Sequence, residues 1–136
     1  LGVGAGFALG AKLVRPDHEV WLLWGDGSAG YSLMEYDTFV RHNVPVISVI
    51  GNDACWSQIY RDQVETFKTD VGCMLAYNNY HEMSAALGAK GHVVRTIADL
   101  PASLREAKAD AAERHSPSLV NVLISKTDFR KGSISV

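Results

Sequence analysis

Apolar residues form runs with little polar interruption at Val20–Trp24, Val44–Ile50 and Leu119–Ile124, and Val93–Thr96 is a shorter candidate strand. Runs of this length without strict alternation are typical of strands that are buried on both faces of a parallel sheet. We therefore expect these four segments to be strands, and we expect both faces of the strands in the two early runs to be covered.

Between these runs, apolar or small residues recur at helical spacing, which predicts helices. The expected helical segments are Leu1–Leu13, Ser32–Arg41, a segment from Trp56 to Phe67, one that starts with a capping box at Asn79–Glu82, and one that starts at Asp99–Pro101. The alternation of strand and helix predicts an α/β fold, with a doubly wound parallel sheet and helices on both faces.

Polar residues follow the first two expected strands directly. Gly25-Asp26-Gly27-Ser28 comes after the first strand, and Asn52-Asp53-Ala54 comes after the second. Because ligands bind at the carboxyl ends of the strands in an open parallel sheet, Asp26 and Asn52 are candidate site residues.

The chemistry of these residues indicates a ligand. Asp26 offers a carboxylate, Asn52 offers an amide oxygen, and the backbone beyond Asn52 offers a carbonyl, so the set is oxygen-only with one negative charge. Such a set suits Mg²⁺ that also binds phosphate oxygens. Gly25 and Gly27 leave room for a phosphate, and Ser28 with the N–H groups of the next helix can donate to it. We expect a Mg²⁺-bridged diphosphate.

Other motifs are weaker. Gly2 and Gly4 suggest a dinucleotide fingerprint, but Phe7 stands where its third glycine belongs and no strand precedes it, which favours a small-faced helix. Cys55 lacks a neighbouring base that would make it a nucleophile, and we expect His81 to be an exposed residue of a first helical turn. Trp56 is either a core anchor or, because it follows the expected metal loop closely, a wall of a cofactor or substrate site.

Composition narrows the possibilities further. A chain of 136 residues with 47% hydrophobic residues can bury one core, so we expect one domain over residues 1–136. A net charge of −2 gives no electrostatic reason to expect nucleic acid or an anionic membrane as partner. Two cysteines are too few for a disulfide framework. The sequence starts without Met, and we expect it to be the C-terminal piece of a longer protein.

Gly25-Asp26-Gly27 followed at the usual distance by Asn52 resembles the thiamine diphosphate motif of the superfamily of acetolactate synthases, pyruvate decarboxylases and 2-hydroxyacyl-CoA lyases. The stretch from Gly25 to His42 is most similar to acetolactate synthase-like proteins related to 2-hydroxyacyl-CoA lyases. Many members have Asn-Asn where this chain has Gly51-Asn52, and Asn52 keeps the position of the ligand. The resemblance covers Leu1–Val136 and implies a thiamine diphosphate-binding fold, here incomplete at its N-terminal edge.

The resemblance also implies roles for residues. The metal ligands would be Asp26, Asn52 and the main chain of Ala54, and Leu1 would support the bent cofactor from below. Together, motif and resemblance give these candidate cofactor-binding residues: Leu1, Gly2, Gly25, Asp26, Gly27, Ser28, Asn52, Ala54, Cys55 and Trp56.

The implied activity is the making or breaking of a carbon–carbon bond next to a carbonyl. One candidate is cleavage of a 2-hydroxyacyl-CoA to formyl-CoA and an aldehyde, and the other is acetolactate synthesis from the 2-oxo acid pyruvate. A non-catalytic domain that serves as an interaction module is the alternative of another class.

In the resembling enzymes, the Glu that activates the cofactor belongs to an N-terminal domain of a partner subunit. We therefore expect no catalytic residue in this chain, no activity of the chain alone, and a homodimer or homotetramer. FAD would belong to a middle domain. The location would be intracellular, with the endoplasmic reticulum membrane reached through an N-terminal anchor. We expect Thr127–Val136 to be a polar tail.

Overall fold

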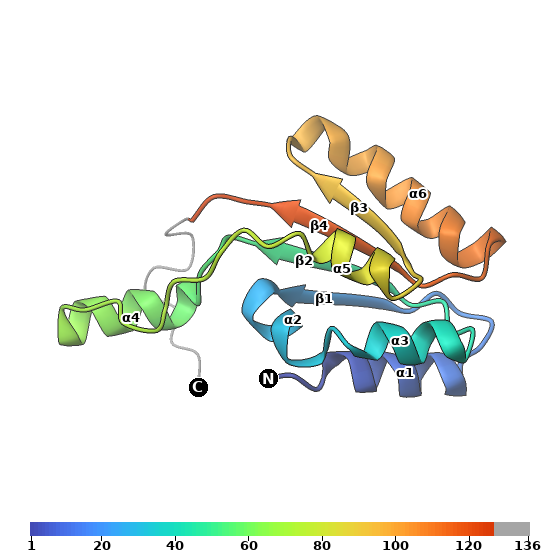
Figure 1. Cartoon of the computed structure of the whole chain (residues 1–136), viewed down its shortest axis with the longest axis horizontal. Coiled ribbons are helices and arrows are strands. Elements are labelled where there is room, and N and C mark those ends of the chain that lie inside the picture. Colours follow the sequence, from blue (N-terminus) through green and yellow to red (C-terminus); the bar gives the residue numbers. More distant parts are fainter. Residues whose placement is uncertain (127–136) are drawn as a thin grey trace.

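A four-stranded parallel sheet with helices on both faces forms the body of the molecule in the computed structural model, which describes residues 1–126 (Figure 1). The sheet order is β1-β2-β4-β3 and every neighbouring pair is parallel. The strands are β1 (Trp21–Gly25), β2 (Ile47–Asn52), β3 (Lys90–Val94) and β4 (Ser118–Leu123). The predicted α/β fold with a parallel sheet is confirmed. The expected tail lies outside the described residues.

Two separate hydrophobic cores lie on the two faces of the sheet. The first packs Ile50 and Leu119 against helices α1 (Gly4–Val14), α2 (Asp26–Ser32), α3 (Glu35–Arg41) and α5 (Tyr80–Ala86). The second packs Ile47 and Val120 against α6 (Leu100–Glu113), which follows the short 3₁₀ helix η1 (Ile97–Asp99). No helix of the described residues is long and apolar enough to cross a membrane.

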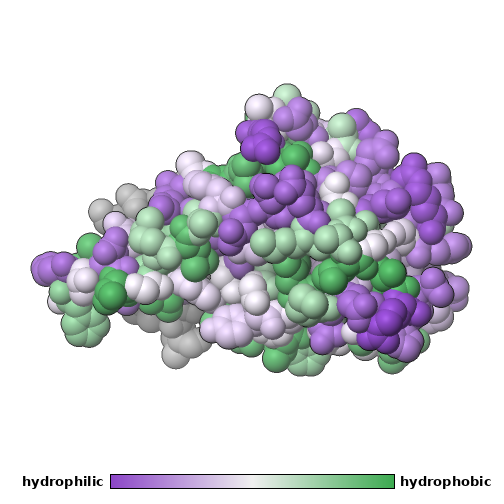
Figure 2. Space-filling model, in the orientation of Figure 1, coloured by the Kyte–Doolittle hydropathy of each residue, from purple (hydrophilic) through white to green (hydrophobic). Residues whose placement is uncertain are grey.

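Helix α4 (Ser57–Phe67) projects away from the sheet, at the left in Figure 1. None of its residues is buried, and Ile59 and Phe67 are exposed. Figure 2 shows hydrophobic surface in green on this projecting end of the molecule. The predicted helical spacing from Trp56 to Phe67 is thus confirmed as a helix, but its Ile59 and Phe67 face solvent and its Tyr60 and Val64 are only half-buried.

Several element boundaries differ from the sequence-based expectation. The expected helix Ser32–Arg41 is two helices, because the chain turns at Leu33 and Met34 between α2 and α3. Strand β2 starts only at Ile47, after Pro45, which has no N–H to donate to a neighbouring strand. The strand extends to Asn52, which pairs with Leu123 of β4. The candidate ligand Asn52 is therefore the last residue of the strand.

The expectation that β1 is buried on both faces is wrong. Trp21 is 39% exposed and Leu23 is 74% exposed. Strand β1 lies at the edge of the sheet, and α6 lies against β2, β3 and β4 on that face. An apolar run shows that a strand is hydrophobic, but it does not show whether helices cover both faces of that strand.

The expected capping box at Asn79 is also wrong in its detail. Asn79 is the N-cap of α5, but its Nδ2 donates to the Glu82 carboxylate at 2.9 Å and no side chain caps the helix. A reciprocal capping box occurs instead at Thr96 and Asp99, where the side chains bond each other's backbone N–H at the start of η1. Since Asn carries both a donor and an acceptor, it can bond the Glu side chain instead of the backbone.

Helix α6 is fastened to the sheet near the amino ends of the strands by the buried carboxylate of Asp110. Its Oδ2 lies 2.7 Å from Nε2 of His92 on β3 and accepts a hydrogen bond from Ser118 Oγ of β4 at 3.4 Å. Its other oxygen accepts from Arg114, and this ion pair raises the pKa of the guanidinium. Both carboxylate oxygens thus have hydrogen-bond partners.

A glycine on β3 tests how closely α5 packs on the sheet. A Cβ at Gly91 would lie 2.0 Å from the carbonyl oxygen of His81, which is a backbone atom. We expect Gly91→Ala to lower the free energy of unfolding by about 2–3 kcal/mol through overpacking. Urea unfolding measures the loss. The matched control is Gly10→Ala on α1, where a Cβ meets nothing within 4 Å and helix propensity gives a gain of about 0.5–1 kcal/mol. Equal stability of the Gly91 variant and the parent would contradict this packing.

Candidate functional site

A cleft of about 710 Å³ opens at the carboxyl ends of β1 and β2. Its walls are the end of β1 with the start of α2, the segment that follows β2, and the start of α4. Seven of the residues predicted from the sequence line it, namely Leu1, Gly25, Asp26, Gly27, Ser28, Cys55 and Trp56. The two polar segments singled out in the sequence therefore do lie side by side.

The carboxylate of Asp26 is the most unusual group in this cleft. Asp26 is the first residue of α2 and is only 2% exposed, and its Oδ2 is buried with no hydrogen-bond partner among the described residues. Burial raises the pKa of this carboxyl group. The backbone N–H groups of Gly27 and Ala54 oppose the rise, and the charge of Asp53 adds to it. A cation would remove this penalty, so the geometry fits a metal ligand.

Asn52 and Ala54, the other predicted metal ligands, lie next to Asp26 but do not line the cleft. Asn52 is fully buried, and its Oδ1 accepts a hydrogen bond from the N–H of Ala54 at 3.3 Å. Ala54 has a left-handed backbone with φ of 54°, and its carbonyl accepts from Leu75 N–H at 2.9 Å. Both oxygens keep a second lone pair for a cation. The Asp26 carboxylate and Asn52 Oδ1 thus both accept from the N–H of Ala54.

The predicted glycines differ in what a side chain at each position would meet. A Cβ on Gly25 would meet no atom within 4 Å, so this residue leaves open space in the cleft that the protein itself does not fill. A Cβ on Gly27 would come within 2.6 Å of the Trp56 ring. Gly2 has φ of +80° and lies against Tyr31 instead of lining the cleft. Gly25 is the glycine at which a ligand could approach the backbone closely.

The remaining candidates around the cleft are Trp56 and Cys55. The Trp56 ring packs over Gly27 and meets Tyr31 edge to face, with ring centroids 6.2 Å apart. Because Trp56 also lines the cleft, its position supports the wall interpretation over the core interpretation. Cys55 is buried, and its Sγ lies 4.0 Å from Met74 Sδ, which is the setting of a packed thiol and not of an activated nucleophile.

His81 is not the exposed residue that we expected, since its side chain is only 12% exposed. It turns inward from α5, and its Nδ1 lies 3.4 Å from Nδ2 of Asn121 on β4. Burial lowers the pKa of its imidazole, while the neighbouring Glu82 opposes this change. Burial therefore favours the neutral imidazole, and its Nδ1 faces the Asn121 amide inside a polar cluster behind the cleft.

Sequence reasoning missed Asp53, which lines the cleft and accepts a hydrogen bond from Ser57. It also missed Tyr80, which donates to the backbone oxygen of Asp26 at 3.3 Å and so links α5 to the start of α2. A signal for Asp53 was present, because it directly follows Asn52 at the end of an expected strand. Nothing local marks Tyr80, since 54 residues separate it from Asp26 along the chain.

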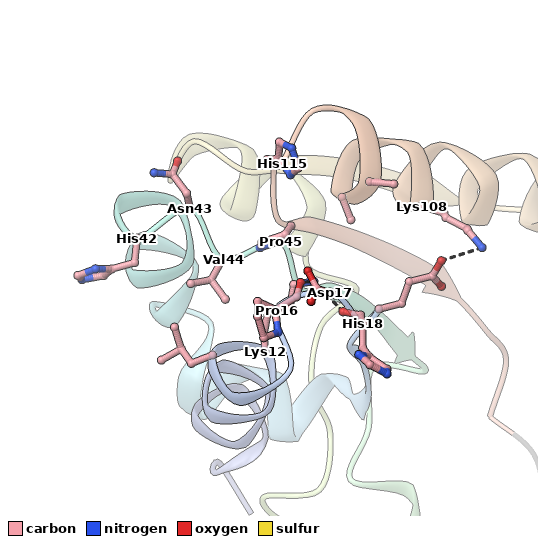
Figure 3. Close-up of a pocket in the computed structure, with 14 residues that line it drawn as sticks. Lys12, Pro16, Asp17, His18, His42, Asn43, Val44, Pro45, Lys108 and His115 are labelled. Carbon is pink, nitrogen blue, oxygen red and sulfur yellow. Dashed lines mark hydrogen bonds and ion pairs between the residues drawn. The ribbon is translucent and has the colours of Figure 1, made fainter.

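A second pocket of about 550 Å³ lies at the opposite end of the strands, beside the segments that lead into β1 and β2, and Figure 3 shows its lining. Its two lysines already have partners, since Lys12 donates to the carbonyls of Pro16 and His18 and Lys108 pairs with Glu19 at 2.7 Å. The carboxyl ends of α1, α3 and α6 border this pocket, and their partial negative charge disfavours anions. A diphosphate therefore fits the first cleft and not this pocket. No three His, Cys, Asp or Glu side chains of the described part form a metal site.

The fold and the cleft together define an α/β domain of the class that binds phosphate-bearing ligands at the carboxyl edge of a parallel sheet. The family described as "Thiamine pyrophosphate enzyme, C-terminal TPP binding domain" matches residues 1–122. The chain belongs to this family of thiamine diphosphate-dependent enzymes.

Individual relatives agree with this assignment. The chain is 54% identical to human 2-hydroxyacyl-CoA lyase 2 and 44% identical to the acetolactate synthase large subunit IlvG of Mycobacterium tuberculosis. These alignments cover 100% and 90% of the chain but only 22% of each relative, so the chain spans about a fifth of their length. A solved structure, the thiamine diphosphate-dependent 4-hydroxybenzoylformate decarboxylase of Rhodococcus jostii RHA1, superposes with a TM-score of 0.85 at 25% identity, over 94% of this chain and 24% of that one.

The buried charge of Asp26 makes a prediction about stability. Burial raises the folded-state pKa of Asp26 above the 3.8 of the unfolded chain. Between these two pKa values the folded protein binds more protons than the unfolded chain, so the free energy of unfolding falls as the pH rises. We expect Asp26→Asn to raise the melting temperature of the metal-free protein by about 2–4 °C near neutral pH. The gain should vanish as the pH falls toward 3.8.

Thermal melts in EDTA across this pH range measure the effect. Asp37→Asn is the matched control, because the Asp37 carboxylate is half exposed and pairs with Arg41. A lower melting temperature for Asp26→Asn than for the parent near neutral pH would contradict the proposed cost of this buried charge.

Proposed function

We propose that this chain is the cofactor-binding domain of a thiamine diphosphate- and Mg²⁺-dependent lyase that acts on carbon–carbon bonds. The observation that carries this proposal is the buried, unpartnered Oδ2 of Asp26 beside the open space at Gly25. A desolvated carboxylate next to unfilled space suits a cation that bridges to phosphate oxygens. The family match supplies the identity of the diphosphate.

In this proposal, Asp26 Oδ2, Asn52 Oδ1 and the carbonyl oxygen of Ala54 hold Mg²⁺. Gly25 provides the close backbone approach, Gly27 makes room for the Trp56 ring, and Ser28 donates to phosphate. Leu1, Cys55 and Trp56, which line the cleft, border the organic part of the cofactor, and Gly2 stays a predicted contact that does not line it. When bound, thiamine diphosphate supplies a ring that accepts the electron pair of the bond being broken, while the protein binds and orients it.

Two substrates follow from the relatives. Cleavage of a 2-hydroxyacyl-CoA to formyl-CoA and an aldehyde is the first choice, because the relatives named 2-hydroxyacyl-CoA lyase 2 reach 54–56% identity over the whole chain. Acetolactate synthesis from pyruvate is the second choice, supported by a 44% identical synthase. A non-catalytic interaction module is less favoured, because Asp26, Gly27, Ser28 and Asn52 of the thiamine diphosphate motif are all present.

The proposal extends to parts outside this chain. The activating Glu and any FAD site belong to other domains. The active site forms between subunits of a homodimer or homotetramer. The chain alone therefore does not turn over substrate. An intracellular location with an anchor in the endoplasmic reticulum membrane completes the proposal. The chain covers only 22% of the human relative, so in a protein of that length these other domains would lie outside it.

The first test is calorimetric titration of thiamine diphosphate into the complete protein, with Mg²⁺ and with EDTA. We expect saturable binding only with Mg²⁺, because Asp26 and the diphosphate repel each other without a bridging cation. Assays of a 2-hydroxyacyl-CoA and of pyruvate then distinguish the two substrates. Absence of binding by the folded, oligomeric protein would overturn the proposal and favour the non-catalytic alternative.

Variants of the metal ligands give a sharper test in the same titration. Asp26→Ala should abolish Mg²⁺-dependent binding, because it removes the formal charge of the ligand set. Asn52→Ala should weaken binding less, by about tenfold or about 1.4 kcal/mol, since water can partly replace a neutral ligand. Asp62→Ala is the control, because Asp62 lines the same cleft on α4 but is exposed. Unchanged affinity of Asp26→Ala, or equal losses for Asp26→Ala and Asp62→Ala, would refute the metal assignment.

A further inference from the structure

Asn121 is a polar residue at a place where the sheet is otherwise apolar. It lies within β4, between Ile50 of β2 and Val93 of β3, and its exposure is 0%. A fully buried amide is costly unless its donors and acceptor are paired. The bonds that Asn121 makes therefore indicate what it does.

The side chain of Asn121 bonds to Asn52, the proposed metal ligand. Asn52 Nδ2 donates to Asn121 Oδ1 at 3.2 Å and to the backbone carbonyl of Asn78 at 3.2 Å. Asn121 Nδ2 donates to the same carbonyl at 3.0 Å, and Nδ1 of His81 lies 3.4 Å from it as a second acceptor. These bonds join Asn52, Asn78, Asn121 and His81 into one polar network.

The backbone groups decide how the two amides are oriented. The carbonyl of Asn78 can only accept, so the atom that each amide turns toward it must be nitrogen. Asn52 Oδ1 accepts from a second backbone group, the N–H of Ala54, at 3.3 Å. The bond from Asn52 Nδ2 to Asn78 and the bond from Ala54 to Asn52 Oδ1 therefore assign the same orientation to this amide.

We infer that Asn121 is a positioning residue that holds the Asn52 amide with its oxygen toward Asp26 and the metal site. With Asn121 present, both N–H bonds of Asn52 are used on the far side and the oxygen remains for the cation. Without it, one N–H of Asn52 is buried without its acceptor, and only the backbone bonds to Asn78 and Ala54 hold the amide, so its oxygen is held less firmly toward the metal site. This inference rests on the proposed function and adds a residue to its metal site.

The test uses Asn121→Leu, which keeps the approximate shape and removes both polar atoms. At saturating thiamine diphosphate, the apparent dissociation constant of Mg²⁺ for the complete protein should rise by about 10–100-fold, as is usual when a partner of a metal ligand is lost. At saturating Mg²⁺, the affinity for thiamine diphosphate should stay near that of the parent. With Mn²⁺ as the probe, the electron paramagnetic resonance spectrum should change.

Two further variants separate positioning from general stability. Ser118→Ala removes another buried polar group of β4, at the end far from the cleft, and should lower the melting temperature while leaving the Mg²⁺ constant unchanged. Asn121→Thr keeps a hydroxyl that can bond Asn52 or Asn78, and should show a smaller loss of Mg²⁺ affinity than Asn121→Leu. The Thr variant also carries the test if the Leu variant does not fold.

The outcomes distinguish this inference from the proposed function. If the parent protein binds thiamine diphosphate with Mg²⁺ and the Asn121 variants keep the parent's Mg²⁺ constant, the positioning role is wrong and the proposed function stands. An equal rise in the Mg²⁺ constant for Ser118→Ala also overturns the positioning role. If the parent protein shows no Mg²⁺-dependent binding, the proposed function fails and this inference fails with it.

Discussion

A carboxylate that is removed from water raises the free energy of a folded protein unless donors or a cation compensate it. Asp26 is in this position at the junction of β1 and α2, with one oxygen that no described group satisfies. The surrounding structure holds it there: Tyr80 of α5 bonds its backbone oxygen, and the N–H of Ala54 approaches its carboxylate. The site is therefore organised around a buried carboxylate with one oxygen that has no hydrogen-bond partner among the described residues.

The parts that hold this charge come from one layer of the fold. Helices α2 and α5 share a core with α1 and α3, and the polar cluster around Asn121 and His81 lies beneath α5. Helix α6 has a separate core on the other face and its own buried carboxylate, Asp110. The sheet thus separates a layer that shapes the cleft from a layer that mainly stabilises the strands.

The sequence was sufficient to place Asp26 and Asn52 together, because apolar runs mark strands and the carboxyl ends of parallel strands meet at one edge. It did not reveal that Trp21 and Leu23 are exposed, since a run of apolar residues does not say which helix covers it. Asn121 was visible as a polar residue within an apolar run, but its partners are 43 and 69 residues away along the chain. Local patterns therefore give elements and their ends, and contacts between distant segments decide the rest.

The acceptor shared by Asn52 and Asn121 is a main-chain atom, the carbonyl of Asn78. Side-chain replacement at Asn78 leaves that oxygen in place, so alanine scanning does not report on it. An insertion or deletion between Leu75 and Asn79 would instead shift the oxygen by a whole residue. The position of the shared acceptor therefore depends on the length of this segment and not on the side chain of Asn78.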